Sequence, residues 1–525
     1  MSKKKLTKII VSVLLIYGIL LLLLIAAENS QGADGQGITD IGKALWYLIA
    51  TLTTVGYGDI TPVTSIGKLI GVLLMVSSAG VLTFLLGLMF SLLFGSLLPG
   101  LKLWLYRRKK WFVFSCLEER TLLLARKIAK GNPDAAYIFI GQNSKNFNDV
   151  FFPIKHFVIV DNQPESVLAM QKSASESSVF FMSHDGWENY DNAWALYKSS
   201  QDKKIQIFCE TEYKPEHIPV NMTVFSRSDI IARSFWLHYP PEHDERIIVL
   251  VGDDKLTRNI LERALLINVY PDDHPVEYHV FGDWCNFRRD HYILSNTVSV
   301  NESKAGWDSI FFHNEPWNDS HALLEMASRI VFCADDEAVN LSNMSELYNY
   351  YPISGRVYVC AKMHENSKAV FFGADDHIFT KENVIQNKIN HLAIQLNELY
   401  RQKSGSGSKW EELSLYQRQS NIAAADHLLT KVRLLLSKEQ TLVVSPETFE
   451  RAYKEYCSYN EEQKEDCRRL EHKRWMRFHY LNNWQYDPVR NNNKRRHNLL
   501  VPYDKLTLQE QSYDDSAWEI LNEVK

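Results

Sequence analysis

One short stretch, TLTTVGYGDITP at residues 51–62, combines residue types whose spacing would let backbone carbonyl oxygens line a path. Gly56 and Gly58 alternate around Tyr57, hydroxyl side chains precede them, and Asp59 follows. Glycine reaches positive φ at little cost, so this stretch can adopt a backbone that alternates in hand. Such a backbone suits either a glycine turn in water or an oxygen-lined path at membrane depth. The flanking sequence distinguishes these two interpretations.

Two long apolar segments flank this stretch. Residues 7–27 are nearly all apolar and long enough to cross a bilayer, and residues 67–98 carry no charge after Lys68. A signal peptide is the alternative for the first segment, but a second span follows and no cleavage-type site does. Lysine and arginine lie beyond both segments, in MSKKK and in RRKK at residues 107–110. The positive-inside rule therefore predicts two cytoplasmic termini and an external segment at 28–40.

Residues 41–53 form a shorter apolar piece that predicts a re-entrant helix followed by extended backbone. Non-helical backbone persists at membrane depth only where it lines a water-filled path or is buried in protein. With TVGYG directly after it, this arrangement resembles the two-transmembrane pore-loop potassium channels of bacteria. The resemblance implies an inner-membrane protein and a selectivity filter made of Thr54, Val55, Gly56, Tyr57, Gly58 and Asp59.

In such a filter, carbonyl oxygens replace the water around a potassium ion. The Thr54 hydroxyl would add a further ring of oxygens, Val55 and Tyr57 would pack the filter against its surroundings, and Asp59 would favour cations at the outer mouth. One chain supplies one wall, so the resemblance implies a homotetramer. In the second apolar segment, Gly80 and Gly87 are candidate gating hinges because glycine weakens a helix. Close helix packing is the alternative reason for a glycine there.

The composition of the 525-residue chain restricts the remaining possibilities. The formal net charge is −5, so nothing indicates nucleic-acid binding. The seven cysteines are scattered and none forms a CxxC pair, so we expect no disulfide framework and no metal site. Scattered cysteines suit a reducing cytoplasm. We identify no catalytic residues and expect no enzyme.

Strand-like and helix-like segments alternate after residue 110. WFVFS at 111–115 begins the first series, and RIIVLVG at 246–252 begins a second, which predicts two Rossmann-like α/β modules. Placed after a pore, they resemble the tandem RCK domains of ligand-gated channels. We therefore divide the chain into a mostly helical membrane pore (1–110), two RCK-like domains (111–240 and 241–400) and a C-terminal region (401–525). The resemblance implies a ring of such domains that acts on the inner helices.

Neither module carries the glycine-rich fingerprint of dinucleotide binding. The first offers SCLEER at 115–120 and the second offers GDDKLT at 252–257, so ordinary NAD binding is disfavoured. Acidic runs at 253–254, 272–273, 335–337 and 375–376 allow a calcium hypothesis. No stretch has EF-hand spacing, however, and solvated loop ends explain these pairs more simply.

The C-terminal region begins with a Gly/Ser-rich stretch at 402–409, which predicts a flexible linker. We expect helices at 420–436 and from Ser445, with Pro446 at the first position. LEHKRW, WQY, KRRH and LVPYD then follow between residues 470 and 504, and this segment resembles the RyR domain named after ryanodine receptors. Asp487 stands where the family often has glycine, and Asn491 to Asn493 stand where it often has acids.

The RyR-like segment combines aromatic and basic side chains. Aromatic faces stack on bases and arginines bind phosphate, which suits a nucleotide-derived ligand. The candidate ligand-binding residues are Trp475, Trp484, Tyr486, Arg490, Arg496, His497, Tyr503 and Asp504. The alternative is that the aromatics form the core of a small helical domain, with the basic residues solvated or paired with Asp514 and Asp515.

The combined hypothesis is a tetrameric potassium channel whose cytoplasmic ring responds to a soluble ligand at the RyR-like domain or the RCK clefts. One alternative is a membrane-anchored, nucleotide-binding regulatory subunit of a potassium transporter. Another is an NAD-dependent membrane enzyme, which the intact TVGYGD and the missing glycine loop disfavour.

Overall fold

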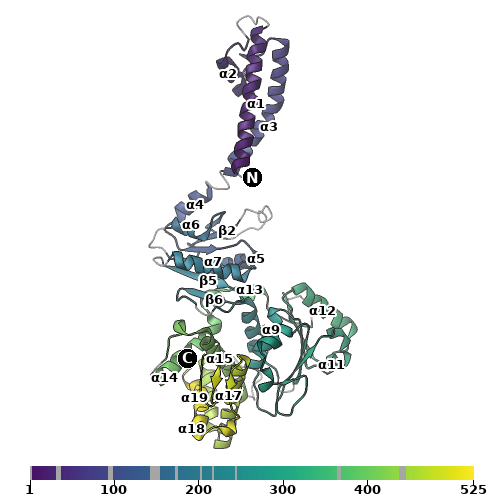
Figure 1. Ribbon diagram of the computed structural model, residues 1–525, viewed down its shortest axis with the longest axis vertical. Coiled ribbons are helices and arrows are strands. Elements are labelled where there is room, and N and C mark those ends of the chain that lie inside the picture. Colours follow the sequence, from purple (N-terminus) through teal and green to yellow (C-terminus); the bar gives the residue numbers. More distant parts are fainter. Residues whose placement is uncertain are drawn as a thin grey trace. The chain divides into compact units, whose positions relative to one another are not determined.

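The computed structural model describes the following residues: 3–30, 37–92, 98–141, 154–171, 176–200, 204–215, 218–242, 245–362, 368–405, 407–436 and 445–524. The chain divides into two compact units, Met1–Leu105 and Tyr106–Lys525 (Figure 1).

The first unit is helical. It contains α1 (Lys3–Ser30), α2 (Ile41–Leu52) and α3 (Ser65–Leu92), and α4 (Leu98–Tyr106) follows. Val11–Ser30 and Ser65–Phe84 are long and apolar enough to cross a membrane, whereas α2 is apolar but shorter. The Asp40 carboxylate caps α2 by accepting from the Lys43 N–H. The expected order of span, short helix and span is therefore present, although the first helix extends further than residue 27.

The second unit begins with a parallel sheet of six strands. These are β1 (Trp111–Phe114), β2 (Ala136–Ile140), β3 (Phe157–Val160), β4 (Ser177–Phe181), β5 (Ile205–Glu210) and β6 (Met222–Phe225). Their order, β3-β2-β1-β4-β5-β6, is that of the doubly wound dinucleotide-binding fold. The helices are α5 (Glu119–Gly131), α6 (Pro164–Ala169), α7 (Gly186–Ser199) and α8 (Arg227–His238). β1 is the WFVFS strand that the sequence predicted, and the alternation of strands and helices that it begins continues to α8.

A second parallel sheet repeats this design. Its strands are β7 (Ile247–Val251), β8 (Glu277–Phe281), β9 (Ser299–Val300), β10 (Ser309–His313), β11 (Arg329–Phe332), β12 (Arg356–Cys360) and β13 (Val370–Phe372). The order is β13-β12-β11-β7-β8-β10-β9, so the short β9 adds an edge to the same arrangement. The helices are α9 (Lys255–Ile267), α10 (Cys285–Asp290), α11 (His321–Met326), α12 (Glu337–Tyr350) and α13 (Asp375–Ile378). Two Rossmann-like modules are thus confirmed.

The C-terminal region is mainly helical. It contains α14 (His391–Ser404), α15 (Leu415–Leu435), α16 (Pro446–Ser458), α17 (Glu461–Leu481), β14 (Gln485–Tyr486), β15 (Arg496–His497), α18 (Leu508–Gln511) and α19 (Ser516–Glu519). The start at Ser445 and Pro446 is confirmed.

The helix predicted at 420–436 is present but starts earlier, and the prediction of a linker was wrong in part. The helix expected from residue 420 begins at Leu415, because Ser414 and Gln417 form a capping box. The stretch at 402–409 is not a flexible linker in its described part. α14 runs to Ser404, Gly405 is left-handed, and α14 packs on α15, so residues 402–404 belong to a helix and not to a linker.

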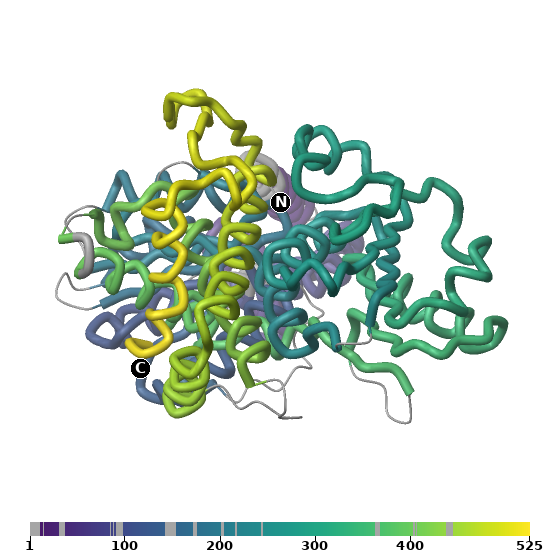
Figure 2. Tube along the Cα trace, turned by 90° about the horizontal axis from the view of Figure 1, so that it is seen from below, coloured from purple at the N-terminus to yellow at the C-terminus, as the bar shows by residue number. Residues whose placement is uncertain are grey.

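Buried ion pairs attach the C-terminal region to the modules. Arg477 on α17 donates from Nη1 to Asp308 Oδ2 of the second module at 2.6 Å, and these side chains are 1% and 2% exposed. Arg233 on α8 pairs with Asp426 on α15 at 2.7 Å. Figure 2 shows the yellow-green helix α17 beside the teal helices of the second module, where it contacts α9. The C-terminal region is therefore an integral part of this unit.

Candidate functional site

The loop after α2 has an unusual backbone. The φ angles of Thr54, Gly56 and Gly58 are 58°, 57° and 72°, so every second residue is left-handed. The N–H groups of Val55 and Gly56 both donate to the Ala50 carbonyl oxygen, at 3.0 and 3.1 Å, which holds the loop against the end of the helix. A left-handed residue other than glycine costs about 1–3 kcal/mol, so the surrounding structure must impose this conformation on Thr54. The alternation that the glycines predicted therefore extends to Thr54.

The far end of this loop is tied to α2 through Trp46. The Trp46 Nε1–H donates to both carboxylate oxygens of Asp59, at 3.0 and 3.2 Å. The Trp46 and Tyr57 rings stack with their centroids 5.7 Å apart. The sequence predicted an electrostatic role for Asp59. The structure adds a hydrogen-bonding role that fixes the loop to the preceding helix.

Glu28 is a functional candidate that the sequence analysis missed. Its buried carboxylate accepts hydrogen bonds from the Thr64 N–H and hydroxyl at 2.9 and 2.7 Å, the Val63 N–H at 3.1 Å and the Ile38 N–H at 3.4 Å. Glu28 thus joins the end of α1 to the chain on both sides of the α2 loop. A single acid at the end of an apolar span was the signal that could have identified it, since such residues are costly in a membrane and usually functional.

The glycines of α3 differ in their surroundings. A Cβ at Gly71 would lie 2.9 Å from Tyr47 Oη and 3.2 Å from Pro62 Cγ, so glycine is needed there for α3 to approach α2. A Cβ at Gly80 or Gly87 would meet nothing within 4 Å in the described chain. Packing within one chain therefore explains Gly71 but gives no reason for glycine at the two hinge candidates.

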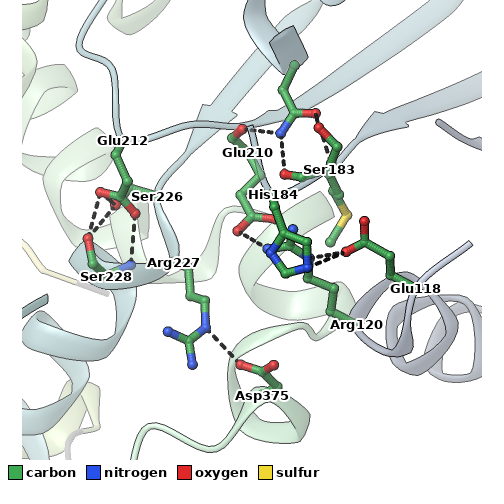
Figure 3. Close-up of polar contacts among 12 residues, drawn as sticks. Glu118, Arg120, Ser183, His184, Glu210, Glu212, Ser226, Arg227, Ser228 and Asp375 are labelled. Atoms are coloured by element: carbon green, nitrogen blue, oxygen red, sulfur yellow. Dashed lines mark hydrogen bonds and ion pairs between the residues drawn. The ribbon is translucent and has the colours of Figure 1, made fainter. Parts of the chain in front are cut away.

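Acidic groups occupy the turn of the first module where a dinucleotide phosphate would lie in this fold. Glu118 is the N-cap residue of α5, and Arg120 pairs with both Glu118 and Glu210, at 3.1 and 3.0 Å (Figure 3). In the second module, Asp254 caps α9 by accepting from the Thr257 N–H. Carboxylates at both helix N-termini repel phosphate, which agrees with the missing glycine fingerprint.

Further charges lie beside this turn. Glu212 accepts from the Ser226 and Ser228 hydroxyls at 2.7 and 2.6 Å, and Arg227 Nε donates to Asp375 at 2.8 Å (Figure 3). Burial raises the pKa of Glu210 to about 7, against the opposing charges of Arg120 and Arg227. Among the described residues, no group of three or more His, Cys, Asp or Glu side chains is arranged to hold a metal ion.

The RyR-like candidates form an aromatic cluster around His479. The Trp475 and His479 ring centroids are 4.0 Å apart, Trp475 and His497 are 4.9 Å apart, and His479 and Trp484 are 5.4 Å apart. Tyr416 of α15 stacks on Trp484 at 5.2 Å. Burial lowers the pKa of His479 to about 3 and that of His497 to about 4, so both rings are neutral at pH 7.

The remaining candidates have other neighbours. Tyr503 accepts from Arg468 Nε at 3.1 Å, and Asp504 pairs with Arg469 at 2.6 Å. Tyr486 and Arg490 are exposed, and the side chain of Arg496 donates to Gln485 Oε1. Trp484, His497 and Tyr503 are buried, which favours a role for them in the core of this domain. Tyr486, Arg490 and Asp504 are exposed, so they are the candidates that a ligand can reach directly.

Two family models match this chain. Residues 9–95 match the family described as an ion channel. This segment is similar to ion-channel pore domains. Residues 458–524 match the RyR domain. Both resemblances found in the sequence are thereby confirmed, and the α2 loop lies within the segment that matches the ion-channel family.

The curated relatives are channels that match over short segments. The voltage-gated potassium channel of Aeropyrum pernix is 46% identical over 52 residues, which cover 10% of this chain and 18% of that protein. The calcium-gated potassium channel TvoK of Thermoplasma volcanium is 32% identical over 120 residues, which cover 21% of this chain and 32% of that protein. The chain thus spans less than a third of the length of these relatives.

Solved structures give a weaker likeness. A crystal structure described as GsuK bound to ADP is 17% identical and covers 72% of this chain and 99% of that chain, with a TM-score of 0.35. A structure described as the GsuK channel bound to NAD is 14% identical, with a TM-score of 0.34, and covers 72% of this chain and 84% of that chain. A likeness at this level supports no conclusion about the ligand of this chain.

Proposed function

We propose that four copies of this chain form a potassium-selective channel whose opening is controlled by a ligand of the cytoplasmic unit. The observation that carries this proposal is the left-handed φ at Thr54, Gly56 and Gly58, in a loop between two candidate membrane spans. Alternation of this kind is what a filter lined by carbonyl oxygens requires. The ion-channel family match supports a pore, and the names of the potassium-channel relatives support potassium as its ion.

Exposed side chains support a tetramer. Val55 and Tyr57 are 54% and 67% exposed in a single chain, although they belong to a backbone that must be held rigidly. Neighbouring copies would cover these side chains and complete the wall around the ion path. We place the protein in the inner membrane of a bacterium with both termini in the cytoplasm, because the basic residues lie on that side of both spans.

The proposed ligand is nucleotide-derived and is bound at the exposed, basic side of the RyR domain. Arg490 is exposed there, and its positive charge reaches Tyr416 and His497 of the aromatic cluster. Calcium is the second candidate, since the relative TvoK is described as calcium-gated. A ligand opens the gate only by its difference in affinity for the open and closed states.

Potassium flux from liposomes that contain the purified chain tests this proposal. Gly56→Ala should abolish flux because alanine is strained at a φ of 57°. Gly18→Ala is the matched control, since Gly18 lies in α1 with open space around its Cα and an ordinary helical φ. Arg490→Gln should reduce the response to whichever nucleotide of a panel changes the flux. No flux under any condition would favour the regulatory-subunit alternative.

A further inference from the structure

A cavity of about 300 Å³ lies inside the cytoplasmic unit, away from the aromatic cluster of the RyR domain. Its walls come from the β5–β6 connection, from α8 and α9, from α14, and from the segment 410–422 that begins α15. Both Rossmann-like modules and the C-terminal region therefore contribute to it. Its volume is at the lower end of the range for small-molecule sites.

Most of the charges that line this cavity are paired. Arg263 Nη2 lies 2.6 Å from Asp229, Arg233 pairs with Asp426, and Lys214 lies 3.7 Å from Glu262. Both carboxylate oxygens of Glu212 accept from groups at the start of α8. Glu212, Asp229 and Glu262, three of the acids that line the cavity, are thus already engaged by the protein.

Arg418 differs from these paired side chains because its hydrogen bonds go to backbone carbonyl groups. It donates from Nε to the Trp410 carbonyl at 3.1 Å and from Nη2 to the Glu411 carbonyl at 2.8 Å. Among the residues that the structure describes, neither Arg418 nor the cavity residue Lys255 forms an ion pair with a carboxylate. A half-buried arginine bound only to neutral carbonyls keeps its charge available to an anion, and its planar group suits phosphate.

The pKa shifts of Glu262 and Arg418 agree with an excess of positive charge around the cavity. Burial would raise the pKa of Glu262, but Lys214, His291, Arg263 and Lys255 lower it to about 2. Burial lowers the pKa of Arg418 even though the charge of Glu411 opposes this shift, so the guanidinium has lost more through burial than this acid restores.

Trp410 supplies an aromatic surface beside this charge. Its ring lines the cavity, and the Arg418 guanidinium lies 5.9 Å from the ring centroid. Aromatic faces stack on nucleobases, and arginine and lysine bind phosphate. We propose that this cavity binds a small phosphorylated molecule with a planar ring, whose phosphate contacts Arg418 and Lys255 and whose ring packs on Trp410.

The site is placed to affect the rest of the unit. Leu415 lines the cavity, and its neighbour Tyr416 stacks on Trp484 of the RyR domain. A ligand would therefore order the start of α15 and, through it, the aromatic cluster. This regulatory role rests on the proposed channel function, whereas binding itself does not.

Isothermal titration calorimetry on the full-length chain in detergent tests the binding. The probes are inorganic phosphate, adenosine, AMP, ADP and NAD. We expect a nucleotide to bind more tightly than either phosphate or adenosine. Arg418→Gln should weaken it about tenfold or more, as the loss of a charged hydrogen bond does. Arg289→Gln is the matched control, because Arg289 is exposed on α10 and does not line the cavity.

Two further variants guard against misfolding. Lys255→Gln should also weaken nucleotide binding, and Trp410→Leu should weaken it while leaving inorganic phosphate unaffected. Thermal melting without ligand shows whether each variant is folded, and an unfolded variant is replaced by one of the other two. The site is refuted if no probe binds the wild type, or if folded cavity variants bind nucleotides as tightly as Arg289→Gln does.

Flux measurements separate this inference from the proposed function. Nucleotide binding that depends on Arg418, without any potassium flux, would support the proposed binding site and contradict the proposed channel function. Potassium flux that responds to a nucleotide, together with nucleotide binding that is unchanged in Arg418→Gln, would support the channel function and contradict the proposed binding site.

Discussion

The buried ion pair between Arg477 and Asp308 gives the sharpest prediction about stability. Asp308 is held by two groups, the Val276 N–H at 2.9 Å and Arg477 Nη1 at 2.6 Å. Among the described residues, Arg477 is the one cation paired with this buried carboxylate, and Arg477→Met removes it. Breaking such a pair from one side costs about 3–5 kcal/mol, because the remaining charge stays buried without compensation.

Urea unfolding of the full-length chain in detergent, followed by tryptophan fluorescence, measures this effect. With a slope of about 3 kcal/mol per molar urea, the midpoint of the cytoplasmic transition should fall by about 1 M. Asp308→Asn combined with Arg477→Met should lose less than Arg477→Met alone, because the asparagine oxygen still accepts from Val276 and no buried charge remains. The difference from additivity gives the coupling between the two residues.

Arg469→Met is the matched control, since Arg469 lies on the same helix and pairs with Asp504 and Glu465 at a partly exposed position. Exposed pairs are worth about 0–1 kcal/mol, so its midpoint should hardly move. If Arg477→Met shifts the midpoint no more than Arg469→Met, the argument that this pair attaches the RyR domain to the second module is wrong.

Three further predictions concern other parts of the chain. Glu28→Gln should lower both the thermal stability of the pore domain and the potassium flux, because an amide N–H₂ would face backbone N–H donors. A variant with the melting temperature and flux of the wild type would contradict this. Gly71→Leu should also impair folding of the pore domain, whereas Gly80→Leu should not, as judged by gel filtration of the purified chains. The pKa values of His479 and His497 lie below the ordinary histidine value, so their contribution to the free energy of unfolding is full above about pH 6.5 and is lost as the pH falls towards 4. In His497→Gln the unfolding midpoint should therefore change less with pH across that window than it does in the wild type.

Local patterns predicted most of the fold. The pore loop and the apolar spans are readable because residue type alone restricts the backbone there, and the largely β-branched run Ile247–Val251 marks β7. The two-residue β9 and the three-residue β13 are too short to carry a pattern. The start of α15 was readable, since Ser414 and Gln417 have capping-box spacing, but the helix signal further along the chain concealed it.

The site was less predictable because its decisive contacts join distant residues. Glu28 binds Thr64, and Arg418 lines a cavity whose walls also include Thr211, the residue directly after β5. Nothing in the sequence around either residue specifies its partner. The aromatic residues of the RyR domain were found by resemblance. Their division into buried and exposed members depends on packing, which only the structure provides.

The attachment of the RyR domain has a consequence for how such proteins can be recombined. A domain joined by a loose tether can be exchanged for another at its ends, but this one presents Arg477 to a carboxylate that lies 169 positions earlier in the chain. A chimera that replaces residues 458–524 would leave Asp308 buried without its cation unless the incoming domain supplies one. A working exchange must therefore change the second module and the RyR domain together.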